Sequence, residues 1–246
     1  MSALLYHVNI ITQLLLRTTM RHLKSILFVF LISTGIVNAG SLPSGFVYLT
    51  DVAPTIVLDM RYAKSENFIG RPIDGYIQQI AITTTEAAMA IKNVQAELLR
   101  YGLGLKIYDA YRPQQGVDHF VRWAKDLKDV LKQAEYYPKV AKQHLFQEGY
   151  IASKSGHSRG STFDLTLVYF DDNNRLQELD MGTPFDFFDP RSWTEHSELT
   201  VTQRTNRLLL KTIMEKYGFK PYSKEWWHFT LKQEPYPETY FNFNVE

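Results

Sequence analysis

The sequence predicts an α+β fold, a single domain with a mostly antiparallel central sheet flanked by helices. Stretches that alternate like strands and stretches with helical periodicity are mixed along the chain, without the regular βαβ rhythm of a parallel sheet. No G-x-G-x-x-G motif follows a strand, and no internal repeat or low-complexity linker divides the chain. These observations favour one domain that does not have a dinucleotide-binding fold.

The predicted domain begins with a strand over residues 55–62, where apolar and polar residues alternate. A helix follows from Thr84 or Thr85 and ends at Gly102, because apolar residues recur at helical spacing between a capping hydroxyl and a glycine. Residues 105–111 form the next predicted strand.

The second half continues the mixture of helices and strands. Residues 115–134 predict a helix with one apolar side, and residues 163–169 predict a strand. The polar residues 171–174 predict a turn that returns the chain as a hairpin. A helix over 205–217 and an aromatic-rich strand over 226–231 complete the domain.

The N-terminus has the layout of a secretory signal. A basic head at 20–24 leads into the apolar run at 26–32, and smaller residues follow where a signal peptidase cleaves. The run is too short for a comfortable membrane span, although an uncleaved anchor is the alternative. We therefore predict that residues 1–39 are an N-terminal extension and signal peptide, with Met20 as an alternative start. Residues 40–246 are the mature domain.

Composition restricts the compartment and the partners. The chain has 246 residues, a net charge of +1 and no cysteine. Removal of residues 1–39, which hold three basic and no acidic residues, changes the charge to about −2. No basic patch is present for nucleic acid, and no membrane association is expected after signal cleavage. Export without disulfides favours a bacterial periplasm.

Four side chains have the chemistry of a mononuclear metal hydrolase. His157 lies in a Gly/Ser loop before the strand that begins near Asp164, and His228 follows Glu225 by three positions. Two imidazoles and one carboxylate bind zinc and leave a fourth position open for water. A further carboxylate, not a ligand, removes a proton from that water. A single histidine is more often structural, but the joint pattern predicts a zinc site in a cleft.

The spacing of Glu225 and His228 differs from the helical H-E-x-x-H device. Residues three apart in a regular strand point to opposite faces of the sheet. We therefore expect Glu225 on the preceding loop or at a bend, turned toward the metal beside His228. A solvated loop carboxylate is the alternative.

Arg112 is a candidate for stabilising an oxyanion. It ends a predicted strand, and Pro113 holds its backbone extended. A fixed guanidinium can stabilise the tetrahedral intermediate of peptide hydrolysis. The alternative is a structural ion pair with Asp109. Three other histidines of the mature domain lack partners at ligand spacing: His119, His144 and His196.

Three motifs resemble those of one known family. They are Ser-x-His-Ser-Arg-Gly-Ser-x-x-Asp-Leu-Thr-Leu from Ser155, Glu-Trp-Trp-His from Glu225, and Asp-x-Tyr-Arg-Pro from Asp109. They resemble the zinc-dependent D-alanyl-D-alanine dipeptidases, the group that includes the vancomycin-resistance dipeptidase. The resemblance extends from about Asp51 to the aromatic tail at 240–241.

The resemblance implies roles for the candidate residues. It implies one Zn²⁺ per chain, bound by His157, Asp164 and His228. It implies that Glu225 is the general base and that Arg112 stabilises the intermediate.

It further implies three substrate-binding residues: Tyr62, Ser155 and Asp186. Asp186 matches the carboxylate that helps to hold the substrate ammonium. Such a group would reject longer acylated peptides, because they would leave a buried charge unpaired.

The chain departs from the family pattern at two places. Gly156 stands where the family has Ser, and Thr162-Phe163 stand where it has a small residue and Ile. We expect Gly156 to cost one substrate hydrogen bond, or a water to replace it. We expect Phe163 to pack in the core.

The primary hypothesis is a zinc metallopeptidase that hydrolyses the dipeptide D-Ala-D-Ala. Zinc-activated water attacks the peptide carbonyl, Glu225 is the general base, and Arg112 stabilises the oxyanion. Two alternatives stay open: a D,D-carboxypeptidase or endopeptidase acting on peptidoglycan stem peptides, and a non-catalytic zinc-containing binder of wall fragments. Residue types do not distinguish D- from L-alanine, so that specificity follows from the resemblance alone. An exported dipeptidase would meet dipeptide released from peptidoglycan, which favours scavenging or wall turnover over antibiotic resistance.

Overall fold

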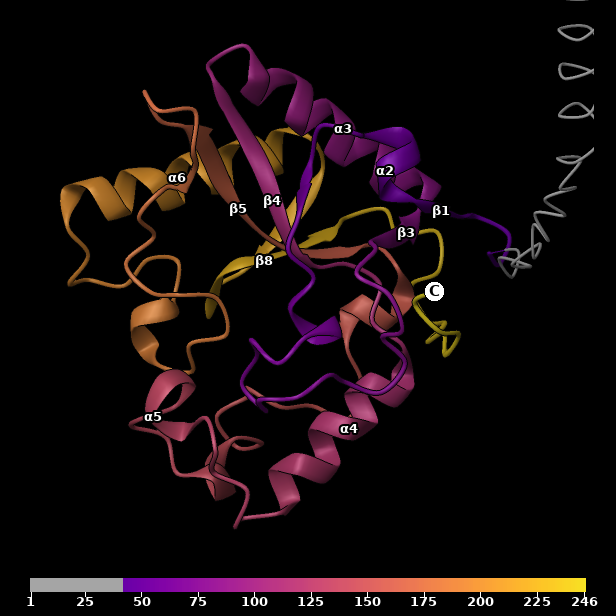
Figure 1. Ribbon diagram of the computed structural model, residues 1–246, viewed down its shortest axis with the longest axis vertical. Helices are drawn as coiled ribbons and strands as arrows, with labels where there is room; N and C mark the ends of the chain where they lie inside the picture. The colour runs from indigo at the N-terminus through magenta and orange to yellow at the C-terminus, as the bar shows by residue number, and fades with distance from the viewer. Residues whose placement is uncertain (1–41) are drawn as a thin grey trace, which may run out of the picture. The chain divides into compact units, whose positions relative to one another are not determined.

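A six-stranded, mostly antiparallel sheet forms the centre of the fold, as the computed structural model shows for residues 42–246 (Figure 1). Its order is β2–β4–β5–β8–β7, and β6 pairs with β5. Only the β2–β4 pair is parallel among these strands, so the predicted fold class is confirmed. The strands are β2 (Val57–Leu58), β4 (Leu103–Asp109), β5 (Thr162–Phe170), β6 (Leu176–Glu178), β7 (Phe219–Tyr222) and β8 (Glu225–Leu231).

The long helices are placed by clear local signals. Helix α3 (Thr85–Leu99) begins at its N-cap Thr84, whose hydroxyl accepts from the backbone amide of Ala87, and its predicted apolar face is buried. Helix α6 (Val201–Lys216) begins four residues earlier than predicted. The reason is a capping box, in which Thr200 and Gln203 satisfy each other's backbone amides.

The remaining elements are short. A second, two-stranded sheet pairs β1 (Phe46–Tyr48) with β3 (Ile82–Thr84), and neither strand was predicted. The others are α2 (Leu49–Val52), α5 (Gln133–Tyr136), η1 (Arg61–Ala63), η2 (Lys142–His144), η3 (Gly156–Arg159) and η4 (Pro190–Ser192).

The predicted helix over 115–134 is wrong in its second half. Helix α4 (Gln114–Lys125) ends early, and α4 and α5 lie below the sheet in the view of Figure 1. The buried ammonium of Lys142 binds the carbonyl oxygens of Asp126 and Asp129, each at 2.6 Å. These carbonyl oxygens therefore accept from a distant side chain and not from the backbone amides of a longer helix. Periodicity alone does not predict such a contact.

The predicted strand over 55–62 is also shorter than expected. Only Val57–Leu58 pair with β4, and the chain then turns into η1, which buries Tyr62. The hairpin after 171–174 is confirmed by the antiparallel pairing of β5 and β6. Phe163 is fully buried against Phe219, as expected for a core residue.

The predicted signal peptide lies outside the described residues. From residue 42 to residue 246, no helix is long and apolar enough to cross a membrane.

Candidate active site

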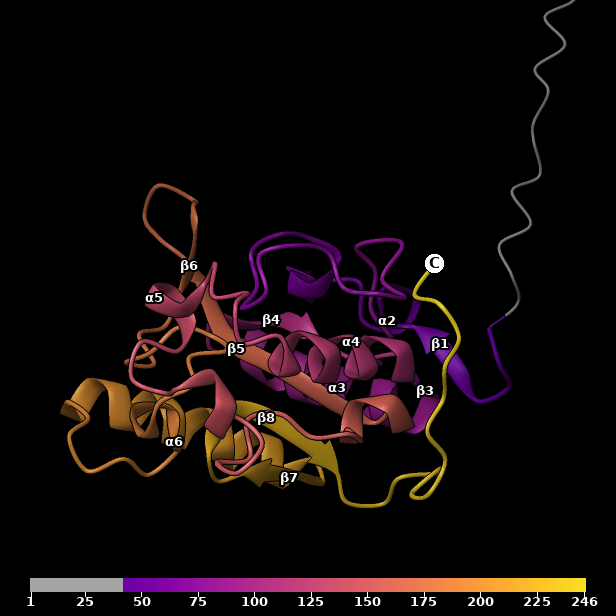
Figure 2. The same ribbon diagram turned by 90° about the horizontal axis from the view of Figure 1, so that it is seen from below.

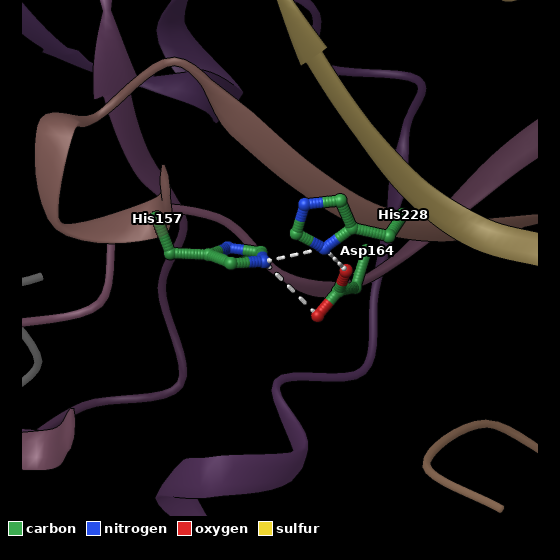
Figure 3. Close-up of side chains that lie close together, drawn as sticks. All are labelled: His157, Asp164 and His228. Carbon is green, nitrogen blue, oxygen red and sulfur yellow. Dashed lines mark hydrogen bonds and ion pairs between the residues drawn. The ribbon is translucent and has the colours of Figure 1, made fainter. Parts of the chain in front are cut away.

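Three potential metal ligands converge from separate elements (Figure 3). Asp164 on β5 and His228 on β8 are direct cross-strand partners, and His157 lies on η3 immediately before β5. His157 Nε2 is 3.3 Å from His228 Nδ1 and 3.2 Å from Asp164 Oδ2. His228 Nδ1 is 3.0 Å from Asp164 Oδ1. The pairing of β5 with β8 thus brings together ligands that lie 64 residues apart.

The donor set fits a zinc ion. Ligand atoms at zinc distances of about 2.0–2.1 Å in a tetrahedral arrangement lie about 3.3 Å from one another, close to the observed separations of 3.0–3.3 Å. His157 Nδ1 donates to the carbonyl oxygen of Ala110 at 2.7 Å. This bond selects the tautomer whose Nε2 lone pair faces the other two ligands.

The electrostatics of the ligand set favour an ionised carboxylate. Burial raises the pKa of Asp164, but the adjacent His157 and His228 outweigh burial and hold that pKa well below its usual value. In turn, burial lowers the pKa of His228, but the hydrogen bond to Asp164 and the charges of Asp164 and Glu225 together outweigh burial and raise it. A cation bound among these groups would take the place of the protons that the imidazoles share with the carboxylate.

Glu225 reaches the same side of the sheet as His228 because β8 is irregular. Pro221 on β7 pairs with Phe229, yet the next residue of β7 pairs with Glu225, so three residues of β8 have no partner on β7. Glu225 Oε2 lies 3.6 Å from His228 Nδ1. Burial, aided by the charge of Asp164 and opposed by His228, raises the pKa of Glu225 to about 7. Glu225 is therefore a carboxylate beside the ligands that can exchange a proton near neutral pH.

Arg112 forms the ion pair with Asp109 and still faces the metal ligands. Its Nε and Nη2 atoms are each 2.9 Å from Asp109 Oδ2, and Nη2 is 3.5 Å from Asp164 Oδ2. The guanidinium also lies over the rings of Tyr62 and Phe120, at 4.9 and 5.0 Å from their centres. The structural pair is thus a clamp that fixes the guanidinium at the site.

One cavity of about 330 Å³ brings all the predicted site residues together. Its lining includes the three ligands, Glu225 and Arg112, and also Tyr62, Ser155 and Asp186.

Tyr62, Asp186 and Ser155 differ in how they meet the cavity. The hydroxyl of Tyr62 donates to Asp186 Oδ2 at 2.9 Å, and burial together with Asp164 raises the pKa of Asp186 well above its usual value. Asp186 also has a backbone φ of 60°, a conformation uncommon outside glycine. Ser155 caps η3 by accepting from the backbone amide of His157 at 3.2 Å, so one lone pair of its oxygen is already used.

Comparison with known proteins decides the family. The D-Ala-D-Ala dipeptidase family of the M15 peptidases matches residues 43–246. The chain belongs to this family. It is 42% identical over 202 residues to the D-alanyl-D-alanine dipeptidase of Enterococcus faecalis, covering 82% of this chain and 98% of that protein.

Two further similarities are more distant. The D-alanyl-D-alanine dipeptidase of Enterococcus faecium is 39% identical over 202 residues, with the same coverage of 82% and 98%. VanYB in complex with D-Alanine-D-Alanine has a TM-score of 0.38 and 14% identity over 64% of this chain and 76% of that chain. The first similarity agrees with membership of the dipeptidase family, and the chain is therefore a metallopeptidase-family hydrolase.

Asp109 and Tyr76 are site residues of this dipeptidase-family chain that the sequence did not single out for function. Asp109 is fully buried, accepts from the hydroxyl of Tyr76 at 2.6 Å and lies 3.4 Å from His157 Nδ1. It therefore touches both the arginine and a metal ligand. The Asp-x-Tyr-Arg-Pro motif contains Asp109, whereas no local signal marks Tyr76.

The two departures from the dipeptidase pattern touch each other. A Cβ atom on Gly156 would lie 2.9 Å from Thr162 Oγ1 and 3.5 Å from Thr230 Oγ1. The two threonine oxygens are themselves hydrogen-bonded at 2.9 Å. A side chain at position 156 would thus press into this pair, so the absence of a side chain compensates for the presence of Thr162. The geometry gives a packing reason for Gly156; because Gly156 also lines the cavity, the expected loss of one substrate hydrogen bond stays a prediction.

Proposed function

We propose that this protein hydrolyses D-Ala-D-Ala, with one zinc ion held by His157, Asp164 and His228. The observation that carries the proposal is the convergence of these three donor atoms beside the partly buried carboxylate of Glu225. The family and the names of the relatives support the dipeptide as the substrate.

The protein supplies the proton transfer through Glu225. When bound, zinc would polarise the peptide carbonyl and lower the pKa of a water in the site. The carboxylate of Glu225 accepts the proton of the attacking water and then donates it to the nitrogen of the leaving amine. A pKa of about 7 suits both transfers, because the group is close to half ionised at neutral pH.

Arg112 stabilises the negative charge that develops on the carbonyl oxygen. Its guanidinium is clamped by Asp109 and packed against Tyr62 and Phe120, so it needs little reorganisation as the charge forms.

Asp186 recognises the substrate amine. It is a buried acid on the cavity wall whose protein partner is the Tyr62 hydroxyl, and a substrate ammonium would supply the missing positive charge. An N-acylated peptide lacks that charge and would forgo the ion pair with Asp186, which disfavours longer substrates.

Glu225→Gln tests the assignment of the base. The variant should bind zinc as the wild type does, because Glu225 is not among the ligands, and should lose turnover of D-Ala-D-Ala by about 10²–10⁴-fold. Zinc content by atomic absorption and kcat by D-alanine release give the two readouts. Near-full activity in this variant would show that another group is the base.

A D,D-carboxypeptidase acting on stem peptides is the second candidate. The cavity of about 330 Å³ lies at the small end of the range of ligand sites, about 300–1,000 Å³, which favours the dipeptide. Side-by-side assays of D-Ala-D-Ala and a pentapeptide stem separate the two, and cleavage of the pentapeptide alone would exclude a dipeptidase.

Export to the periplasm is part of the proposal. It is supported by the basic head and apolar run before residue 40. N-terminal sequencing of the protein from a periplasmic extract should begin at Gly40, and a protein confined to the cytoplasm with Met20 or an earlier residue retained would refute export.

A further inference from the structure

The C-terminal segment, residues 241–245, caps the helix that follows Arg112. Pro113 is the N-cap of α4, and it makes no side-chain hydrogen bond to the helix. The carbonyl oxygen of Phe241 accepts from the first amide of α4 at 3.0 Å, and Asn242 Oδ1 accepts from the second at 2.7 Å. The free backbone amides at the start of α4, which a nearby capping side chain or water usually binds, are thus bound by a distant part of the chain.

The same segment holds the backbone beside a metal ligand. The amide of Phe241 donates to the carbonyl oxygen of Ser158 at 2.8 Å, next to His157. The ring of Phe243 stacks on Tyr111 at 4.1 Å, and the Tyr111 hydroxyl donates to the carbonyl oxygen of Phe243 at 2.9 Å. The segment therefore contacts the residues adjoining the arginine and the first histidine.

A third contact leads to the carboxylate that clamps the arginine. The amide of Val245 donates to the carbonyl oxygen of Gly75 at 2.8 Å, and the carbonyl oxygen of Val245 accepts from Ile77 at 3.0 Å. Tyr76, between them, donates its hydroxyl proton to Asp109. In both views the end of the chain lies beside β1 and β3 (Figures 1 and 2).

We propose that residues 241–245 are a positioning element of the active site, and that Asn242 sets the position of Arg112 by capping α4. No atom of Asn242 lines the cavity, so it acts through the helix start and not on the substrate. This inference rests on the proposed function, because its effect is read as turnover of D-Ala-D-Ala.

The test compares Asn242→Ala with Asn242→Asp and with Thr200→Ala. Asn242→Ala removes the cap of α4, and a displaced Arg112 should lower kcat by about 10- to 100-fold with KM almost unchanged, because the arginine acts on the transition state. Asn242→Asp keeps an oxygen acceptor at a helix N-terminus and should restore most of the activity. Thr200→Ala removes the equivalent cap of α6, so it should lower the melting temperature similarly while kcat stays at the wild-type value.

Zinc affinity, measured by competition with a chelator, is the readout that does not depend on turnover. It should be the same in Asn242→Ala and the wild type, since Asn242 contacts α4 and not η3. Equal kcat in Asn242→Ala and Thr200→Ala, or no rescue by Asn242→Asp, would overturn the positioning role. A wild type that never cleaves the dipeptide would refute the proposed function itself. If Asn242→Ala does not fold, Asn242→Gln, which displaces the same amide by one methylene, tests the contact with the same readouts.

Discussion

Replacing Gly156 by alanine perturbs the packing between η3 and β5. The new Cβ would lie 2.9 Å from Thr162 Oγ1, a distance that side-chain carbons do not tolerate, so an atom must move. Thr162 cannot easily move, because it is fully buried, β-branched and hydrogen-bonded to Thr230. Overpacking of this kind costs about 1–3 kcal/mol.

Part of that cost is offset in the unfolded chain. The backbone of Gly156 is not in the left-handed region, so alanine stabilises by about 0.4–1 kcal/mol through the lower entropy of the unfolded state. The net loss is up to about 2.6 kcal/mol, and about 1.3 kcal/mol at the middle of both ranges, which lowers the melting temperature of a protein of this size by about 3–5 °C.

The assay is thermal unfolding of four proteins at saturating zinc: wild type, Gly156→Ala, Thr162→Ala and the double variant. Thr162→Ala alone leaves Thr230 without its partner and should destabilise by about 1 kcal/mol. The double variant should be more stable than the sum of the single effects predicts by at least about 1 kcal/mol. Strict additivity of the two single effects in the double variant would show that a side chain at position 156 does not clash with Thr162.

Three further predictions follow from buried charges. Asp109→Asn should lower the free energy of unfolding by about 3–5 kcal/mol in urea, because it removes the nearer of the two carboxylates that face the buried Arg112 charge, and a loss below about 1 kcal/mol would contradict the clamp. Lys142→Met should cost about 1–3 kcal/mol, since two carbonyl groups after α4 lose their donor, with no change in kcat; a fall in kcat would mean that this loop shapes the site. Because Glu225 accepts a proton only when ionised, a pKa of about 7 predicts that kcat/KM falls as the pH decreases below about 7. Bound zinc would lower the pKa of Glu225 and so move this fall in kcat/KM to lower pH. A fall centred above pH 8 would therefore exclude Glu225 as the base.

The candidate metal site was predictable because its chemistry is restricted to few residue types. One histidine in a loop, and an aspartate and a second histidine in predicted strands, needed only the correct strand pairing to converge, and β5 pairs with β8 in that register. The position of Glu225 could be narrowed to a bend from strand geometry alone. The structure then places Glu225 at the irregular pairing of β8 with β7.

Local signals also placed the elements whose stability is local. Thr84 and the apolar face of α3 predicted that helix well, because cap and periodicity lie within the helix itself. Helix α4 was predicted too long, since the event that ends it is the binding of its following carbonyls by Lys142. Contacts between residues far apart in the sequence cannot be predicted from local hydrophobic periodicity.

The same limit applies to the residues that support the proposed catalytic side chains. Tyr76 and Asn242 lie far from Asp109 and α4 in sequence, and neither belongs to a motif. In the sequence, Gly156 and Thr162 are two separate departures from the family pattern. Their contact could not be predicted, because it depends on how η3 packs against β5.

We propose that His157, Asp164 and His228 bind zinc for the hydrolysis of D-Ala-D-Ala. The most direct measurement is zinc content together with turnover of D-Ala-D-Ala and L-Ala-L-Ala by residues 40–246, before and after chelation and zinc readdition. The expected result is one zinc per chain, turnover of the D,D-dipeptide, loss of that turnover with the metal and its return with zinc. Full turnover by the metal-free protein, or cleavage of L-Ala-L-Ala without cleavage of D-Ala-D-Ala, would contradict it.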